Sequence, residues 1–239
     1  PPMTKALIAL LMAGKLGKFL TTGGTMLISI FTYALFYGWR LGVGLVGLIF
    51  VHEMGHYIAA KKSNLNVGAP CFIPFVGAWI NLKEQPMNAE VEAYVGIAGP
   101  ILGSVGAFVC YLIAHMIGSN ALLAIAYAGF MLNLFNLIPI SPLDGGRIVS
   151  VISPRIWLVG IPILAGLFIF QPSPLLLMIG IFAIPQAISA FKQRNIESTQ
   201  YYRASRQVRL NYSFQYLLLV ATLSLAAYQI HEQLTGRSF

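Results

Sequence analysis

Long apolar runs dominate this sequence and limit the folds that are open to it. Hydrophobic residues make up 57% of the 239 residues and charged residues only 9%, whereas soluble domains carry about 25% charged residues. A surface with so few charges has to face lipid, where the backbone must satisfy its own hydrogen bonds. The runs occupy residues 22–37, 41–60, 94–117, 121–138, 156–170, 174–191 and 213–230. They predict an all-α polytopic membrane protein with about six to seven transmembrane helices, some shorter than the roughly 20 residues of a straight span.

The chain reads as a single membrane-embedded domain over residues 1–239. We expect a catalytic core at 41–150 and peripheral helices at 5–38 and 155–231. Within the peripheral segment at 5–38, residues 5–20 form a separate apolar run with three lysines. Such a run is either an interfacial amphipathic helix or the start of the first span.

The basic residues predict the orientation in the membrane. The net charge is +8, but the basic residues flank apolar runs and form no stripe on a soluble surface, so we expect no nucleic-acid partner. With a cytoplasmic N-terminus and seven crossings, 13 of the 15 Lys and Arg fall on the cytoplasmic side, and only Arg40 and Arg237 fall outside. Because cytoplasmic loops are enriched in Lys and Arg, the N-terminus is predicted to be cytoplasmic, in a multi-pass protein of the cell membrane.

The motif His52-Glu53-Met54-Gly55-His56 lies inside the second apolar run. Residues four apart share a helix face, so His52 and His56 can bind one Zn²⁺, and Glu53 can take a proton from water at the metal. His52 lies about 17 Å along the helix from Leu41, which is past the midplane and nearer the cytoplasm. The alternative is a pair of hydrogen-bonded histidines and a neutral Glu53 in a polar core.

A catalytic zinc usually has a third protein ligand, and Asp144 is the candidate. The other acids besides Glu53 lie in polar connections or after the last run. Pro139 and Pro142 break the helix before Asp144, and broken backbone at membrane depth must be buried or line a cavity. An ordinary cytoplasmic turn, in which Asp144 pairs with Arg147, is the alternative.

Three features of the sequence resemble the site-2 protease family of intramembrane zinc metalloproteases. They are the HEMGH motif, the glycines Gly99 and Gly103, and the stretch Asn136-Leu-Ile-Pro-Ile-Ser-Pro-Leu-Asp-Gly-Gly-Arg-Ile148. The resemblance covers most of residues 41–148. It implies that His52, His56 and Asp144 hold one zinc per chain and that Glu53 is the catalytic base. It also implies that Asn136 engages the substrate backbone. Unlike many members of that family, this sequence gives no sign of a PDZ or CBS module.

Residues 69–82 are apolar but too short to span. Their β-branched and aromatic residues, with Pro74 and Gly77, predict a re-entrant strand or hairpin near the membrane edge. An exposed strand edge could hold an unwound substrate by backbone hydrogen bonds. A loop that only plugs the cytoplasmic face is the alternative, and the family resemblance favours substrate clamping. The residues expected to bind substrate there are Val76, Gly77, Ala78, Trp79 and Ile80.

The sequence therefore predicts an intramembrane zinc endopeptidase that cuts single-span membrane proteins near the cytoplasmic side, in regulated intramembrane proteolysis. Its partners would be a transmembrane substrate and the lipid bilayer, with no soluble cofactor. The alternative function is a membrane metal-ion transporter or sensor that uses the same His and Asp ligands. Transport would require further polar ligands along a continuous pathway.

Overall fold

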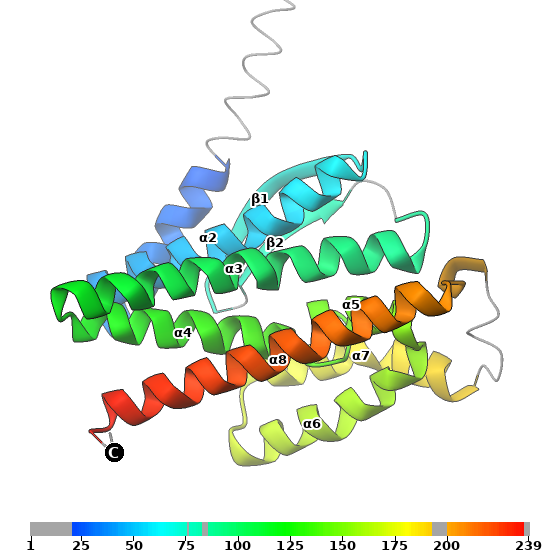
Figure 1. Ribbon diagram of the computed structural model, residues 1–239. Helices are drawn as coiled ribbons and strands as arrows, with labels where there is room; N and C mark the ends of the chain where they lie inside the picture. Colours follow the sequence, from blue (N-terminus) through cyan, green and yellow to red (C-terminus); the bar gives the residue numbers. More distant parts are fainter. Residues whose placement is uncertain (1–20, 76, 83–85, 193–199, 237–239) are drawn as a thin grey trace, which may run out of the picture.

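The protein is mostly helical, as the sequence predicted (Figure 1). The computed structural model describes residues 21–75, 77–82, 86–192 and 200–236. Residues 21–37 are helical. The later helices are α2 (Trp39–Lys62), α3 (Ala89–Ile117), α4 (Asn120–Asn136), α5 (Asp144–Ile152), α6 (Trp157–Phe170), α7 (Pro174–Lys192) and α8 (Arg206–Leu234), with short 3₁₀ turns η1 (Pro154–Ile156) and η3 (Gln200–Tyr202). The strands are β1 (Val67–Ile73) and β2 (Gly77–Leu82). The apolar run at 5–20 lies outside the described residues.

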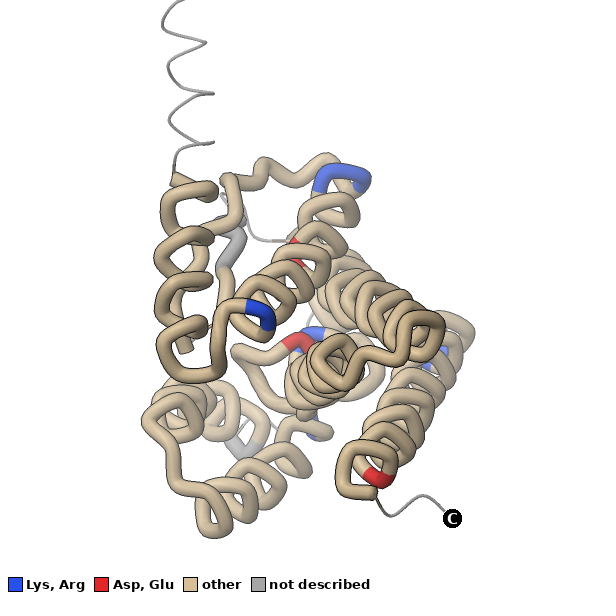
Figure 2. Tube along the Cα trace, turned by 90° about the vertical axis from the view of Figure 1, so that its left-hand side faces the viewer, with Lys and Arg blue, Asp and Glu red and all other residues tan. Residues whose placement is uncertain are grey.

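Among the described residues, three helices, α2, α3 and α8, are long and apolar enough to cross a membrane. The charged residues are sparse along the described chain, most of which is drawn in tan in Figure 2. The predicted count of six to seven spans is not confirmed, because the other apolar helices are shorter. For example, α4 has 17 residues and α6 has 14, which correspond to about 25 and 21 Å, against a hydrocarbon thickness of about 30 Å.

Helix α8 is longer than the apolar run at 213–230 that predicted it. It has 29 residues and begins at Arg206, because the Ser205 side chain caps it by accepting a hydrogen bond from the Val208 backbone N–H. Its first turns are polar and contain Arg206 and Arg209, two of the basic residues on which the predicted orientation rests. Hydropathy alone misses such a polar start, whereas the capping serine marks it.

The helices pack around α3. Helix α3 contacts α2, α4 and α5, and α8 contacts α4 and α5, so that these helices lie side by side in Figure 1. A tight turn joins α3 to α4: Gly118 adopts the left-handed conformation with φ of 65°, and Ser119 caps α4. The buried core between them includes Ile97, Phe130 and Leu223, from α3, α4 and α8. The long helices thus form one bundle around α3.

The predicted hairpin is present as an antiparallel pair of strands beside α2 (Figure 1). In the pairing, Phe72 lies opposite Ala78 and Ile73 opposite Gly77. Val76 lies outside the described residues. The strands extend over residues 67–82, two residues longer at the start than the expected segment.

Irregular backbone separates α4 from α5, where Pro139 and Pro142 were expected to break the helix. The segment at 137–143 folds back against the start of α5, at positions where side chains on Gly145 and Gly146 would collide with its backbone. Two aromatic side chains bond to carbonyls here: Tyr216 Oη donates to Leu137 O at 2.6 Å, and Trp157 Nε1 donates to Gly146 O at 2.8 Å. Most of the broken backbone is therefore buried by protein, although Pro142 is exposed.

Candidate metal centre

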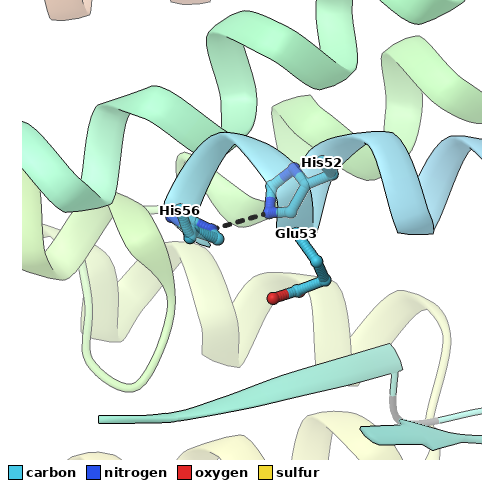
Figure 3. A group of neighbouring side chains, drawn as sticks. All are labelled: His52, Glu53 and His56. Carbon is cyan, nitrogen blue, oxygen red and sulfur yellow. Dashed lines mark hydrogen bonds between the residues drawn. The ribbon is translucent and has the colours of Figure 1, made fainter. Parts of the chain in front are cut away.

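The two histidines of the HEMGH motif lie on one face of α2, one helical turn apart (Figure 3). Both are buried, and their Nε2 atoms are 3.1 Å apart. Glu53 is also buried, and its carboxylate oxygen and the two imidazole nitrogens lie within 4.8 Å of one another. In Figure 3 its side chain points away from the histidine rings, toward the side on which the strands lie. The motif therefore gives two clustered nitrogens with a carboxylate beside them.

Asp144, the first residue of α5, completes this cluster. Its Oδ2 atom lies 3.1 Å from His52 Nε2 and 3.2 Å from His56 Nε2. Its other oxygen, Oδ1, lies 3.7 Å from Arg147 Nη1. The two alternatives weighed from the sequence, a contact with the histidines and an ion pair with Arg147, are thus present together, one on each carboxylate oxygen.

The remaining ring nitrogens of both histidines face hydrogen-bond acceptors. His52 Nδ1 lies 2.8 Å from Asn133 Oδ1, and His56 Nδ1 lies 2.7 Å from Val95 O. The Asn133 amide donates to Gly129 O at 2.7 Å, which turns its oxygen toward His52. Both Nδ1 atoms must therefore carry the protons, and in neutral imidazoles the two Nε2 atoms then present lone pairs.

The residues present fit a zinc ion. Two imidazole lone pairs and a carboxylate oxygen form a triangle with edges of 3.1, 3.1 and 3.2 Å. Ligands at about 2.0–2.1 Å from a tetrahedral zinc are separated by about 3.3 Å. Three acceptors this close repel one another in a buried site unless a cation lies among them. The donor set and its spacing are those of a three-ligand zinc centre.

Helix α3 can approach this cluster because it has glycines where it meets α2 and α4. A Cβ atom on Gly99 would collide with the His56 imidazole, and one on Gly103 would collide with the Asn133 amide. Gly55 on α2 is similarly close to the Ala98 carbonyl of α3. These glycines set the close packing that brings the Val95 carbonyl to His56.

The residues expected to bind substrate that the structure describes lie at the end of α4 and in β2. Asn136 is partly buried at the end of α4, and its amide donates to Leu132 O at 3.2 Å. Gly77, with φ of 117°, and Ala78 begin β2 and are partly buried. Trp79 and Ile80 follow in the same strand. Val76 lies outside the described residues.

The sequence did not predict Asn133 as part of the site. This residue is fully buried in α4, one turn before Asn136. A signal was available, because a polar side chain inside an apolar span is costly and is usually paired. The sequence could not identify the partner, since His52 is 81 residues away in the chain.

Asn133→Ala is expected to weaken zinc binding by roughly 10- to 100-fold, because His52 loses the acceptor that fixes its tautomer and ring orientation. Zinc affinity of the full chain, measured by competition with a chelator, tests this. Asn136→Ala is the matched control, since its amide bonds only within its own helix in the contacts described above, and it should leave zinc affinity within about twofold. Equal losses in the two variants would contradict the role of Asn133.

Comparison with known proteins places this site in a family context. Residues 41–119 match the model of peptidase family M50. A zinc metalloprotease of Methanocaldococcus jannaschii is 30% identical over 109 residues, which are 44% of this chain and 31% of the relative. A probable chloroplast zinc metalloprotease of Arabidopsis thaliana is 23% identical over 157 residues, 46% of this chain and 29% of the relative.

Among solved structures, the site-2 protease from Methanocaldococcus jannaschii matches with a TM-score of 0.46 and 22% identity, covering 76% of this chain and 88% of that chain. The matched region spans about a third of the length of the two curated relatives. The match to the family model, at residues 41–119, includes the whole of α2 after Arg40 and the whole of α3. The resemblance to site-2 proteases that the sequence indicated is thus confirmed as a match to peptidase family M50 over residues 41–119.

Proposed function

We propose that this protein is a zinc endopeptidase that cuts transmembrane segments of single-span membrane proteins near the cytoplasmic side of the membrane. The observation that carries the proposal is the buried triangle of two imidazole nitrogens and one carboxylate oxygen, with a second carboxylate beside it. Relatives named as zinc metalloproteases support it. In this proposal His52, His56 and Asp144 hold one zinc.

Glu53 acts as the catalytic base. A zinc bound here supplies Lewis acidity, which polarises the scissile carbonyl and makes the attacking water more acidic. Glu53 takes the proton of that water and passes it to the leaving amine. Its position supports this role, since its carboxylate lies in the cluster but points away from the imidazoles. Asp144 is better placed than Glu53 to bind the metal, because its oxygen is nearly equidistant from the two Nε2 atoms.

The hairpin presents the substrate as an added strand, and one of its edges is already covered. Thr22 Oγ1 donates to Pro70 O at 2.7 Å, and Phe72 N donates to Thr25 Oγ1 at 3.2 Å. These bonds join the outer edge of β1 to the helix at residues 21–37. A substrate strand would therefore add to β2, on the edge away from β1.

The pairing register identifies which β2 residues face that edge. Backbone groups point to alternate sides along a strand. Pro70 and Phe72 point away from β2 toward the threonines, and they pair with Ile80 and Ala78. Ala78 and Ile80 accordingly direct their backbone groups away from β1, while Gly77 and Trp79 of the same strand face β1. Asn136 is the next candidate for holding the unwound substrate backbone.

The rest of the chain forms one membrane domain with six to seven spans and a cytoplasmic N-terminus, in the plasma membrane. The motif lies in the second half of α2, close to Lys61 and Lys62 in its last turn. This supports an active site nearer the cytoplasm, from which water reaches it. The competing transporter function needs more ligands along a pathway. Within the described parts of the chain, the metal-spaced group is at His52, Glu53 and His56, and Asp144 adjoins the same two imidazoles.

Glu53→Gln should abolish cleavage, with a loss of roughly 10²- to 10⁴-fold, while zinc stays bound, because the amide keeps the shape but cannot accept the proton. Tagged single-span candidates co-expressed with the full chain report cleavage, and metal analysis reports zinc. Glu90→Gln makes the same chemical change at an exposed site at the start of α3 and should cut normally. Cleavage by Glu53→Gln at near wild-type rate would exclude the metalloprotease mechanism.

Ala78→Pro and Ile80→Pro should each reduce cleavage at least about 10-fold, because proline removes the outward-facing N–H that pairs with the substrate. The pairing with β1 does not use those N–H groups, so zinc content should stay normal. Ile80→Ala is the matched control, and it should have a milder effect because the main chain carries the pairing. If both proline variants cut like wild type, the hairpin is a lid and the substrate is held elsewhere.

A further inference from the structure

A line of polar contacts leads from the metal-site carboxylate to the segment that precedes α8. Arg147 Nη1 lies 3.7 Å from Asp144 Oδ1, and Arg147 Nε lies 4.0 Å from Glu92 Oε1. The other Glu92 oxygen accepts a hydrogen bond from the Tyr201 hydroxyl at 2.7 Å. These residues come from α5, the first turn of α3, and η3. Three elements therefore meet in one polar cluster outside the ligand triangle.

The two oxygens of Asp144 have different partners. Oδ2 faces both histidines, and Oδ1 faces Arg147. A carboxylate can rotate about its terminal bond, and a partner on the second oxygen restricts that rotation. Arg147 is suited to this because its side chain lies one helical turn after Asp144 on α5. The close approach of α5 to α3 at Gly96, where a Cβ would lie 3.1 Å from Arg147 Cβ, keeps the base of that side chain in place.

Arg147 is itself held by Glu92. Their side chains are only 20% and 26% exposed, so their interaction is less screened than that of a surface ion pair. Burial, and then the neighbouring Glu92 carboxylate, raise the pKa of Tyr201 above its ordinary value. The phenol therefore stays protonated across the neutral pH range and donates a hydrogen bond to Glu92.

We propose that Arg147 is a positioning residue that holds Asp144 with one oxygen turned to the metal, and that Glu92 and Tyr201 hold Arg147 in place. The η3 segment then acts on metal affinity through this chain of contacts. The inference rests on the proposed function, in which Asp144 is a zinc ligand.

The sign of the effect of Arg147→Gln separates positioning from simple electrostatics. A cation near a bound zinc repels it, so removal of that charge alone would tighten zinc binding. Loss of positioning has the opposite effect, and we expect zinc affinity to fall by roughly 10- to 100-fold. The measurement is competition with a chelator, using the full chain in lipid nanodiscs. Arg147→Lys, which keeps the charge but lacks the planar fork, should recover part of the loss.

Arg203→Gln is the matched control for the change in charge. Arg203 is exposed and lies beside η3, so its substitution should leave zinc affinity within about twofold. Unchanged or tighter binding in Arg147→Gln, or an equal loss in Arg203→Gln, would overturn the inference.

The outer members of the chain are tested in the same assay. Tyr201→Phe should weaken zinc binding by roughly threefold and Glu92→Gln by more, because each acts through the next residue. In an Arg147→Gln background, Tyr201→Phe should have no further effect. An undiminished effect of Tyr201→Phe in that background would show that it acts by another route and would overturn the chain.

Asp144→Ala distinguishes failure of this inference from failure of the proposed ligand set. If Asp144→Ala loses zinc and Arg147→Gln does not, only the inference fails. If Asp144→Ala binds zinc like wild type, both fail. The visible spectrum of the Co²⁺-loaded chain adds a readout that a purely structural role would not change. Arg147→Gln should alter that spectrum, since the carboxylate ligand turns, whereas Arg203→Gln should preserve it.

Discussion

Three buried acceptor atoms repel one another in the interior of this protein, and the packing of the surrounding helices holds them together. His52 Nε2, His56 Nε2 and Asp144 Oδ2 lie 3.1–3.2 Å apart in a bundle of apolar helices. The Nδ1 protons are directed to Asn133 and Val95, so the facing Nε2 atoms have only lone pairs to offer. A divalent cation bound among them would turn this repulsion into attraction and would link α2 to α5. Close helix packing at the glycines of α3 is what allows that link to form.

The break between α4 and α5 brings the Asp144 carboxylate into the buried interior beside α2. Asp144 lies at the start of a nine-residue helix, where exposed backbone N–H groups favour a negative charge. Tyr216 of α8 donates to the Leu137 carbonyl of the irregular segment before Asp144, and Trp157 of α6 donates to the Gly146 carbonyl of α5. If one continuous helix ran through this region, Asp144 would not lie at a helix start that faces α2. The proline and glycine residues therefore serve the metal site as much as the fold.

The parts of this account that the sequence could predict are the local ones. The i, i+4 spacing of His52 and His56 follows from helical geometry, and the hairpin follows from β-prone residues around Pro74 and Gly77. The sequence could not show that Asn133 orients His52, because that contact depends on how α2 and α4 pack. For Asp144, an ion pair with Arg147 and a contact with the histidines were treated as alternatives, whereas a carboxylate has two oxygens and makes both contacts. Hydropathy alone also could not predict the number of spans, because α4 and α6 end early at turns and prolines.

The position of the metal in the zinc-loaded full chain would test whether His52, His56 and Asp144 are its ligands. Anomalous diffraction at the zinc absorption edge locates the ion without reference to any assumed ligands. We expect a single peak, about 2.0–2.2 Å from each of His52 Nε2, His56 Nε2 and Asp144 Oδ2, with Glu53 outside direct contact. A peak bound by Glu53 in place of Asp144, or several peaks along a path between the helices, would contradict it.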